Sequence, residues 1–317
     1  MHKKINSELN IAVLMLSYNA ERYIEEAIKS FLNQKGITNW KLYIADDLSA
    51  DKSREIIIKY KKSYPEKVDY FFNERNLGIS KNLFTNYLKI KSKYVVFASG
   101  DDIMEDQFFL YSSYNILKKD NSLSFTYANG HSFNEFDKSN VKPINCAPPP
   151  QNPFSFGEWA PKKFYINIHA IMFRTEKYPS KFENWVFESQ TDDYLHRIFL
   201  LLVGKGFYQN KFSSLYRIRA DGAQNLTDKN NVELYFKSLK TMKGLDKYAR
   251  NNFSINAFNN FFGQYSVISM IYMSKKSYLR SIYYLALAVK ERSNFLEKKL
   301  LLKTLLKSLF FNYTPKF

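Results

Sequence analysis

The chain has 317 residues, of which 45% are hydrophobic and 17% aromatic; this composition supports a sizeable core and excludes disorder over most of the length. A formal net charge of +17 indicates an anionic partner, but it does not choose between nucleic acid, an acidic membrane surface and a phosphorylated substrate. The single cysteine, Cys146, excludes an intramolecular disulfide and a cysteine-based zinc site, and it fits a reducing compartment.

The first hundred residues alternate between continuous apolar runs and segments with helical periodicity. We expect strands at residues 11–16, 42–45, 68–72 and 94–98, each of the first three followed by a helix. The repeated strand–loop–helix order predicts right-handed crossovers and an α/β fold with a mostly parallel sheet flanked by helices. A polar cluster follows each strand (SYN, DD, NLG and SGDD), and in such sheets ligands bind beyond the carboxyl ends of the strands. The four clusters together predict a binding site on that edge.

The segments that follow are less regular. Residues 141–156, VKPINCAPPPQNPFSF, are too rich in proline for a helix or a central strand, so we expect a loop there. Strand-like composition returns at 164–173. TDDYLHRIFLLLVGKG, residues 191–206, predicts a helix with Thr191 as its N-cap. SSLYRIRADG then predicts a short strand and a turn.

The C-terminal region, residues 226–317, is expected to be helical and to follow a first domain at residues 1–225. Its last segment, NFLEKKLLLKTLLKSLFF, groups leucines in one stripe bordered by lysines. Two interpretations stay open: an interfacial helix on an anionic membrane surface, or ordinary packing with the lysine stems lying over apolar surface. No apolar run approaches the ~20 residues that a membrane-spanning helix needs, and we interpret the N-terminal segment as a buried strand, not a signal peptide.

Two adjacent carboxylates, Asp101 and Asp102, follow the fourth strand in the stretch FASGDD. A strand-end carboxylate together with phosphate oxygens would suit Mg²⁺ or Mn²⁺, which prefer oxygen ligands. The alternative is that the two residues cap a helix beginning near Glu105. The motif by itself does not decide between them.

Four blocks of the sequence resemble a known family. SYNAERYIEEAIKSFLNQ, DDLSADKS, NLGISKN and FASGDD are similar, in order and relative placement, to blocks of the inverting glycosyltransferases of family 2. The resemblance covers roughly residues 9–222 and implies the GT-A fold, a nucleotide-sugar-binding α/β domain. It also implies that Asp101 is a metal ligand, with Asp102 as its neighbour or as a cap.

The resemblance implies contacts to the nucleotide from the first two loops. Ser17, Tyr18 and Asn19 would contact the base and ribose. Asp46 or Asp47 would accept a hydrogen bond from the base or from a ribose hydroxyl. For the two aspartates a turn with a helix cap remains the alternative.

A third block would complete the donor pocket. By resemblance, Asn76, Gly78 and Asn82 shape the pocket and Lys81 brings a cation near the phosphates, although a tight turn explains Gly78 almost as well. The four histidines of the chain are scattered. We interpret His169, in an apolar stretch, as a core or pocket residue and not as a ligand.

The block TDDYLHR resembles the acidic pair in which the family carries its general base. Inverting transfer needs a carboxylate that takes the proton from the acceptor hydroxyl as this attacks the anomeric carbon. Asp193 matches the second member of the pair, with Asp192 as runner-up. Either residue could instead only place negative charge in the first turn of the helix.

The sequence departs from the family at several of these positions. Leu48 stands where the family usually has glycine. Ser99, followed by Gly100, stands where the family usually has its first acid, and a serine hydroxyl could still reach the ribose. YRIRADG resembles the family's YRxH block with Arg219 in place of the histidine. Arg217 and Arg219 could therefore neutralise the diphosphate, and a third protein ligand for the metal is in doubt.

These observations predict a metal-dependent inverting glycosyltransferase using Mg²⁺ or Mn²⁺. Its partners would be a nucleoside diphosphate sugar, a glycan or lipid-linked glycan acceptor as in surface polysaccharide assembly, and an anionic membrane surface, with no nucleic acid. We expect it in the cytoplasm or on the cytoplasmic face of the inner membrane. The alternative is a non-catalytic polyanion- or glycan-binding protein on the same fold, favoured by the departures at Ser99 and Arg219.

Overall fold

The computed structural model describes residues 9–144, 148–159, 166–189, 192–220 and 232–254, together with Tyr283 and Leu287. The chain divides into two compact units, one made of residues 1–187 and 192–222 and the other of 188–191 and 223–317. In the second unit the described part is mainly helix α8 (Val232–Phe253). Most of the C-terminal segment, with its leucine stripe, lies outside the described residues. Within the described ranges, none of the helices combines the length and the hydrophobicity needed to span a bilayer.

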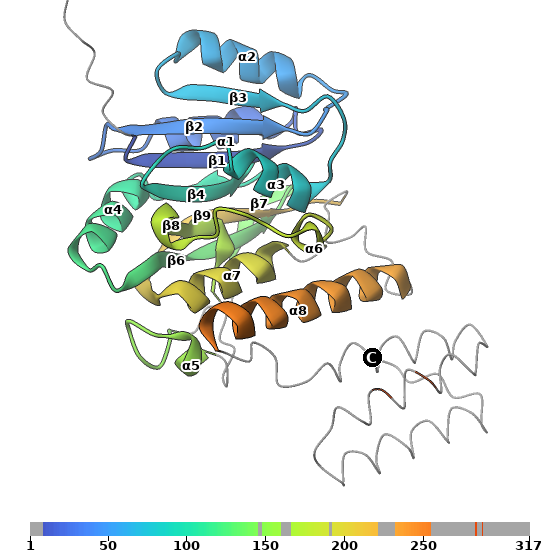
Figure 1. The fold of residues 1–317 in the computed structure, drawn as a ribbon. Coiled ribbons are helices and arrows are strands. Elements are labelled where there is room, and N and C mark those ends of the chain that lie inside the picture. Colours follow the sequence, from blue (N-terminus) through green and yellow to red (C-terminus); the bar gives the residue numbers. More distant parts are fainter. Residues whose placement is uncertain are drawn as a thin grey trace, which may run out of the picture. The chain divides into compact units, whose positions relative to one another are not determined.

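The first unit is organised around one mixed sheet. Its described strands follow the order β3-β2-β1-β4-β8-β6-β9-β5, with β7 paired to β6 (Figure 1). The strands are β1 (Ile11–Ser17), β2 (Trp40–Asp46), β3 (Val68–Phe72), β4 (Tyr94–Ser99), β5 (Ile103–Met104), β6 (Leu123–Asn134), β7 (Asp137–Pro143), β8 (Ile171–Arg174) and β9 (Lys205–Ile218).

Parallel pairing dominates the sheet, as the sequence predicts. β1 pairs in parallel with both β2 and β4, and β2 with β3. The long strands β6 and β9 are also parallel, whereas β5, β7 and β8 join by short antiparallel registers. The prediction of a mostly parallel α/β fold is confirmed.

Helices cover both faces of the sheet. They are α1 (Ile24–Leu32), α2 (Ser53–Ser63), α3 (Ile79–Tyr87), α4 (Phe109–Lys119), α5 (Phe156–Trp159), α6 (Asn184–Phe187) and α7 (Asp192–Val203), with short 3₁₀ turns η1 (Ile168–Ala170) and η2 (Thr175–Lys177). β1 explains this arrangement, because Ile11 to Met15 are all completely buried, as expected for a strand covered on both sides. Alternate residues of β1 pack with Ile24 and Ile28 of α1. On the other face Tyr87 of α3 meets Phe97 of β4, with ring centroids 5.8 Å apart.

Four local features differ from the sequence-based expectations. β6 was not predicted, because Asn129, Gly130 and His131 interrupt its apolar pattern, and β9 is far longer than the short strand expected. The loop predicted at 141–156 begins inside edge strand β7, where Pro143 is tolerated at the strand end. No helix begins at Glu105: β5 lies there and α4 starts at Phe109, so the capping alternative for the two aspartates fails.

Candidate active site

Three strand ends bring the predicted loops together at one edge of the sheet. The parallel register places Ser17 beside Asp46 and Leu16 beside Ser99. The ladder continues past β4, since the N–H of Gly100 donates to the Leu16 carbonyl at 2.7 Å. Residues that are far apart in the sequence therefore share one edge, where parallel sheets bind ligands.

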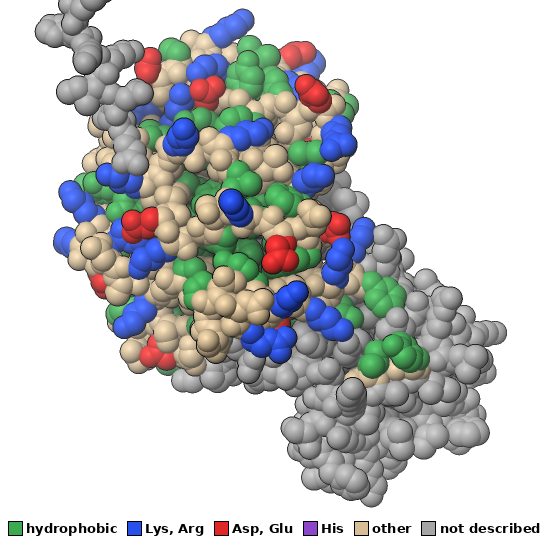
Figure 2. Space-filling model, viewed as in Figure 1, with side chains coloured by type: hydrophobic (Ala, Val, Ile, Leu, Met, Phe, Trp, Pro, Cys, Tyr) green, Lys and Arg blue, Asp and Glu red, His purple; other side chains and the backbone are tan. Residues whose placement is uncertain are grey.

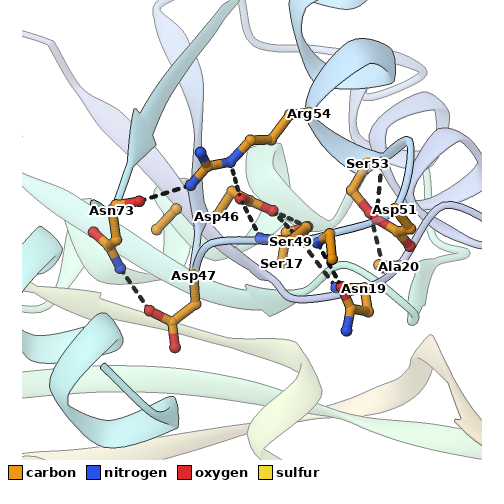
Figure 3. Close-up of polar contacts among 12 residues, drawn as sticks. Ser17, Asn19, Ala20, Asp46, Asp47, Ser49, Asp51, Ser53, Arg54 and Asn73 are labelled. Atoms are coloured by element: carbon orange, nitrogen blue, oxygen red, sulfur yellow. Dashed lines mark hydrogen bonds and ion pairs between the residues drawn. The ribbon is translucent and has the colours of Figure 1, made fainter. Parts of the chain in front are cut away.

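Asp46 is completely buried and its carboxylate is fully used inside the protein (Figure 3). Oδ1 accepts hydrogen bonds from Arg54 Nε at 2.6 Å and from the Ser49 N–H at 3.1 Å. Oδ2 accepts from the hydroxyls of Ser17, at 3.2 Å, and Ser49. A carboxylate offers about four lone-pair positions, and all of them are taken. Of the two aspartates predicted to contact the nucleotide, Asp46 instead ties the loops after β1 and β2 together.

Asp47 keeps one acceptor position. Its Oδ1 accepts from Asn73 Nδ2 and from the N–H of Leu77, and its Oδ2 accepts from the N–H of Gly78, each at 2.8 Å. One of the roughly four lone-pair positions therefore remains on Oδ2. Gly78 has a φ of 78°, a conformation that favours glycine. The glycine of the third block thus serves both the turn and Asp47.

Asn82 belongs to a buried amide network and does not line the site directly. It is 2% exposed, donates to the Ala45 carbonyl at 3.0 Å, and accepts from Asn73 at 2.9 Å and Asn86 at 2.7 Å. Asn73 also donates to Asp47, so the amide network orients the Asp47 carboxylate. Asn76 is exposed and accepts from the Gly78 N–H at 3.1 Å, while Lys81 is only partly buried.

The first loop presents an exposed ring. Tyr18 is 52% exposed, next to Asn19, whose backbone has a φ of 46°. The Asn19 N–H donates to Ser49 Oγ and its Oδ1 accepts from the Ala50 N–H, both at 2.9 Å. Leu48, where the resembling family has glycine, adopts a φ of 64°, which costs a leucine about 1 kcal/mol. The family preference thus reflects a left-handed backbone position.

Asp101 is paired through both carboxylate oxygens. Ser99 Oγ donates to Oδ1, and Arg219 Nη1 lies 2.9 Å from Oδ2. The Asp101 and Arg219 side chains are 22% and 12% exposed, so solvent reaches both. The preceding residue, Gly100, leaves no room for a side chain. A Cβ there would lie 2.8 Å from Ile24 Cδ1 and 2.9 Å from the Leu16 carbonyl oxygen.

Asp102 points into the protein. Its Oδ1 accepts from the N–H of Arg217 at 2.9 Å, and its Oδ2 lies 2.9 Å from Nδ1 of His169. Burial raises the pKa of the Asp102 carboxyl, and the nearby imidazole opposes that rise. Burial lowers the pKa of the His169 imidazole, but the negative charge of Asp102 and its hydrogen bond to the imidazole act in the opposite direction. Asp193 and Asp101 make smaller contributions in the same direction as Asp102, so the pKa is raised overall. His169 therefore lies within electrostatic reach of all three aspartates, and the sequence offered no signal for this beyond its apolar surroundings.

The contacts of Arg217 are with other residues of the protein interior. It is 3% exposed, its Nε donates to the Asp101 carbonyl at 2.9 Å, and its Nη2 donates to Glu26 at 2.7 Å. Its guanidinium also lies over the rings of Tyr23, at 4.8 Å, and Phe133, at 4.6 Å. Of the two arginines predicted to face the diphosphate, Arg217 anchors β9 to α1 and to the aspartate loop.

Asp193 stands in the first turn of α7. Its side chain is exposed to solvent, yet the surrounding protein reduces its hydration enough to raise the pKa of its carboxyl, with His169 and Arg197 opposing. A raised pKa favours proton uptake at a site that solvent can reach, as a general base requires. The side chain of Asp192 lies outside the described part of the structure.

An aromatic cluster fixes α7. His196 is buried, its Nδ1 lies 2.8 Å from the Tyr178 hydroxyl, and its ring centroid is 4.7 Å from that of Phe97 and 5.0 Å from that of Phe173. Burial lowers the pKa of His196 to about 3. A neutral imidazole one turn beyond Asp193 thus locks the helix against β4 and β8.

A divalent cation fits poorly in this arrangement. Asp102 faces inward, and Asp101 already holds Arg219 at 2.9 Å. An Mg²⁺ ion on Asp101 would have to share the carboxylate with the Arg219 guanidinium, whose Nη1 lies 2.9 Å from Oδ2. Across the described ranges, no three His, Cys, Asp or Glu side chains are grouped to hold a metal.

The described residues form an α/β domain with polar side chains gathered at the carboxyl ends of its parallel strands. The family model for glycosyl transferase family 2 matches residues 12–182, and the chain belongs to this family. The resemblance seen in the sequence is confirmed.

Curated relatives match only in part. The putative teichuronic acid biosynthesis glycosyltransferase TuaG of Bacillus subtilis is 33% identical over 29% of this chain and 36% of its own length. The chain spans between 11% and 36% of the length of the first relatives it matches.

Solved structures show the same fold at low identity. The S. aureus TarS fragment in complex with UDP-GlcNAc covers 95% of this chain and 93% of its own, with a TM-score of 0.59 and 14% identity. The mannosyltransferase PcManGT from Pyrobaculum calidifontis, in complex with GDP-Man and Mn²⁺, covers 97% and 83%, with a TM-score of 0.52 and 12% identity. The GT-A type of fold is confirmed.

Proposed function

We propose that this chain transfers a sugar from a nucleoside diphosphate sugar to an acceptor hydroxyl with inversion at the anomeric carbon. The observation that carries the proposal is that one sheet edge gathers the nucleotide loops, the Asp101–Arg219 pair and, within electrostatic reach of His169, the Asp193 carboxyl. Family membership supports the reaction class. The UDP-GlcNAc in complex with TarS and the GDP-Man in complex with PcManGT support the donor class.

We propose different roles for the two aspartates after β2. Asp47 has an acceptor position left for a base N–H or a ribose hydroxyl, whereas Asp46 has none. The exposed ring of Tyr18 and the adjacent Asn19 are available to contact the base or ribose. Ser99, at the end of β4, and Lys81, near the start of α3, stay predicted contacts to the ribose and the phosphates.

In the proposed reaction Asp193 is the general base. As the acceptor oxygen bonds to the anomeric carbon, its proton passes to the Asp193 carboxylate. The bond from the anomeric carbon to the diphosphate breaks, and its electron pair leaves with the nucleoside diphosphate. Holding both reactants at one edge contributes orientation, and positive charge beside the leaving diphosphate stabilises the transition state.

The acceptor and the cellular setting remain proposals. Relatives with names in teichoic and teichuronic acid biosynthesis support a glycan or lipid-linked glycan acceptor in surface polymer assembly. Figure 2 shows Lys and Arg side chains spread over the visible face of the described surface, with acidic ones between them. The expectation of no nucleic acid stays a prediction. A cytoplasmic or peripheral location remains a prediction.

The metal also stays a prediction. The Mn²⁺ in the PcManGT complex supports it, while the pairing of Asp101 with Arg219 argues against it.

A donor screen tests the proposal. Nucleotide sugars are screened with and without Mn²⁺ for a thermal shift, and release of nucleoside diphosphate is then followed for any that bind. Asp193→Asn should bind the donor like the wild type and lose turnover, while Asp192→Asn, with the same change of charge one residue away, should keep it. Absence of any nucleotide-sugar binding, or full turnover in Asp193→Asn, would refute the proposal.

A further inference from the structure

Resting on the proposed function, we infer that Arg219, held by Asp101, is the positive charge that meets the donor diphosphate, so that this chain binds a nucleoside diphosphate without a divalent cation. Ser99 and Arg219 are two departures from the family pattern. Both departures contact the same carboxylate.

The first step is that these two residues satisfy Asp101 from opposite sides. Ser99 Oγ donates to Oδ1 and Arg219 Nη1 lies 2.9 Å from Oδ2. With an acid in place of Ser99, the site would carry a second negative charge and attract a dication. With serine and arginine, a hydrogen-bond donor meets each Asp101 oxygen, and the guanidinium lies where a dication would have to approach the carboxylate.

The second step is that Arg219 is positioned by a separate set of contacts. Its guanidinium lies over the Tyr23 ring at 4.8 Å. The Tyr23 hydroxyl donates to Glu135, which also accepts from the N–H of Ala220 at 2.7 Å. The backbone beside Arg219 is thus fixed to the same ring that the guanidinium stacks on, so the cation is oriented before any ligand arrives.

The third step separates Arg219 from its neighbour in the motif. Arg217 is 3% exposed and committed to Glu26 and to the Asp101 carbonyl. Arg219 is bonded to a carboxylate that solvent reaches, beyond the end of β9. A planar guanidinium matches two phosphate oxygens at once and carries a charge that pH does not remove. Arg219 is therefore the arginine suited to a diphosphate.

The test measures nucleotide binding without turnover. UDP, GDP, CDP, ADP and dTDP are titrated calorimetrically into the full chain, once in EDTA and once in Mn²⁺. The wild type should bind at least one nucleotide in EDTA within about threefold of its affinity in Mn²⁺. Arg219→Gln should weaken that binding on the order of tenfold or more in both buffers. At a fixed concentration of this nucleotide, the electron paramagnetic resonance signal of free Mn²⁺ should be the same with and without protein.

Two variants serve as controls. Arg22→Gln makes the same change of charge at a side chain that is 59% exposed and 3.4 Å from Glu135, and it should bind like the wild type. Arg219→Lys keeps the charge and loses the fork, so its metal-free affinity should fall between those of wild type and Arg219→Gln. Circular dichroism of each variant verifies that it is folded.

The outcomes are distinct. Binding that disappears in EDTA and returns with Mn²⁺, or an Arg219→Gln variant that binds like the wild type, overturns this inference and leaves the proposed function standing. If no nucleotide binds in either buffer, the proposed function fails and the inference fails with it.

Discussion

The ion pair between Arg54 and Asp46 offers the sharpest test of how the donor edge is built. Arg54→Met removes the guanidinium whose Nε lies 2.6 Å from Asp46 and whose Nη2 lies 2.7 Å from the Asn73 carbonyl oxygen. Breaking a buried pair typically costs about 3–5 kcal/mol. Here Arg54 is 28% exposed, and Asp46 keeps donors from two serines, so the pair itself should account for about 2 kcal/mol. The lost bond to Asn73 adds about 1 kcal/mol.

Urea unfolding followed by tryptophan fluorescence measures this loss of about 3 kcal/mol. The three tryptophans, Trp40, Trp159 and Trp185, all belong to the first compact unit, so the signal reports on that unit. Arg75→Met, at an exposed arginine two residues beyond Asn73, should change stability by less than about 0.5 kcal/mol.

A double-mutant cycle with Asp46→Asn isolates the pair. The double variant should be more stable than the sum of the two single effects by about 2 kcal/mol. A loss below about 1 kcal/mol in Arg54→Met, or a coupling energy near zero, would show that Arg54 does not hold Asp46. In that case Asp46 would return as a candidate for the nucleotide contact.

Three further perturbations have defined outcomes. Gly100→Ala should destabilise the first unit by about 1–3 kcal/mol and reduce transfer, because the new Cβ would lie 2.9 Å from the immobile Leu16 carbonyl oxygen; unchanged urea midpoint and turnover would contradict the reported packing. The pKa of His196 is about 3 in the folded protein and about 6.5 in the unfolded protein. Between these two pH values the unfolded state binds more protons than the folded state. The free energy of unfolding should therefore fall by about 2 kcal/mol from pH 7 to pH 5. His196→Gln should flatten that slope, and an equal slope in both proteins would exclude His196 as its source. The raised pKa of Asp193 should place the acidic limb of the kcat/KM profile above the usual aspartate range, and a limb near pH 4 would refute this.

The sequence predicted best those features that depend on the pattern of a single strand or helix. The apolar run of β1 predicts a doubly covered strand, and the four polar clusters predict the functional edge. It could not separate Asp46 from Asp47, because the difference depends on Arg54, in the first turn of α2, and on Asn73, just after β3.

The same limit applies at the second half of the site. Arg217 and Arg219 look alike in YRIRADG, and only the contact of Arg217 with Glu26 on α1 marks it as structural. His169 lies 2.9 Å from Asp102 because it belongs to the 3₁₀ turn η1, which precedes β8. The sequence carries no signal for this turn. β6 was missed because Asn129, Gly130 and His131 interrupt its apolar pattern; a Cβ on Gly130 would lie 2.6 Å from Ser214 Oγ of the paired strand β9.

Donor hydrolysis in the absence of acceptor, followed by proton NMR of the released sugar, tests the central claim of inverting transfer most directly. With an α-linked nucleoside diphosphate sugar identified in the binding screen, water should replace the acceptor and the β anomer should appear first. Its formation should be lost in Asp193→Asn and retained in Asp192→Asn. Initial release of the α anomer, or an undiminished rate in Asp193→Asn, would contradict the account.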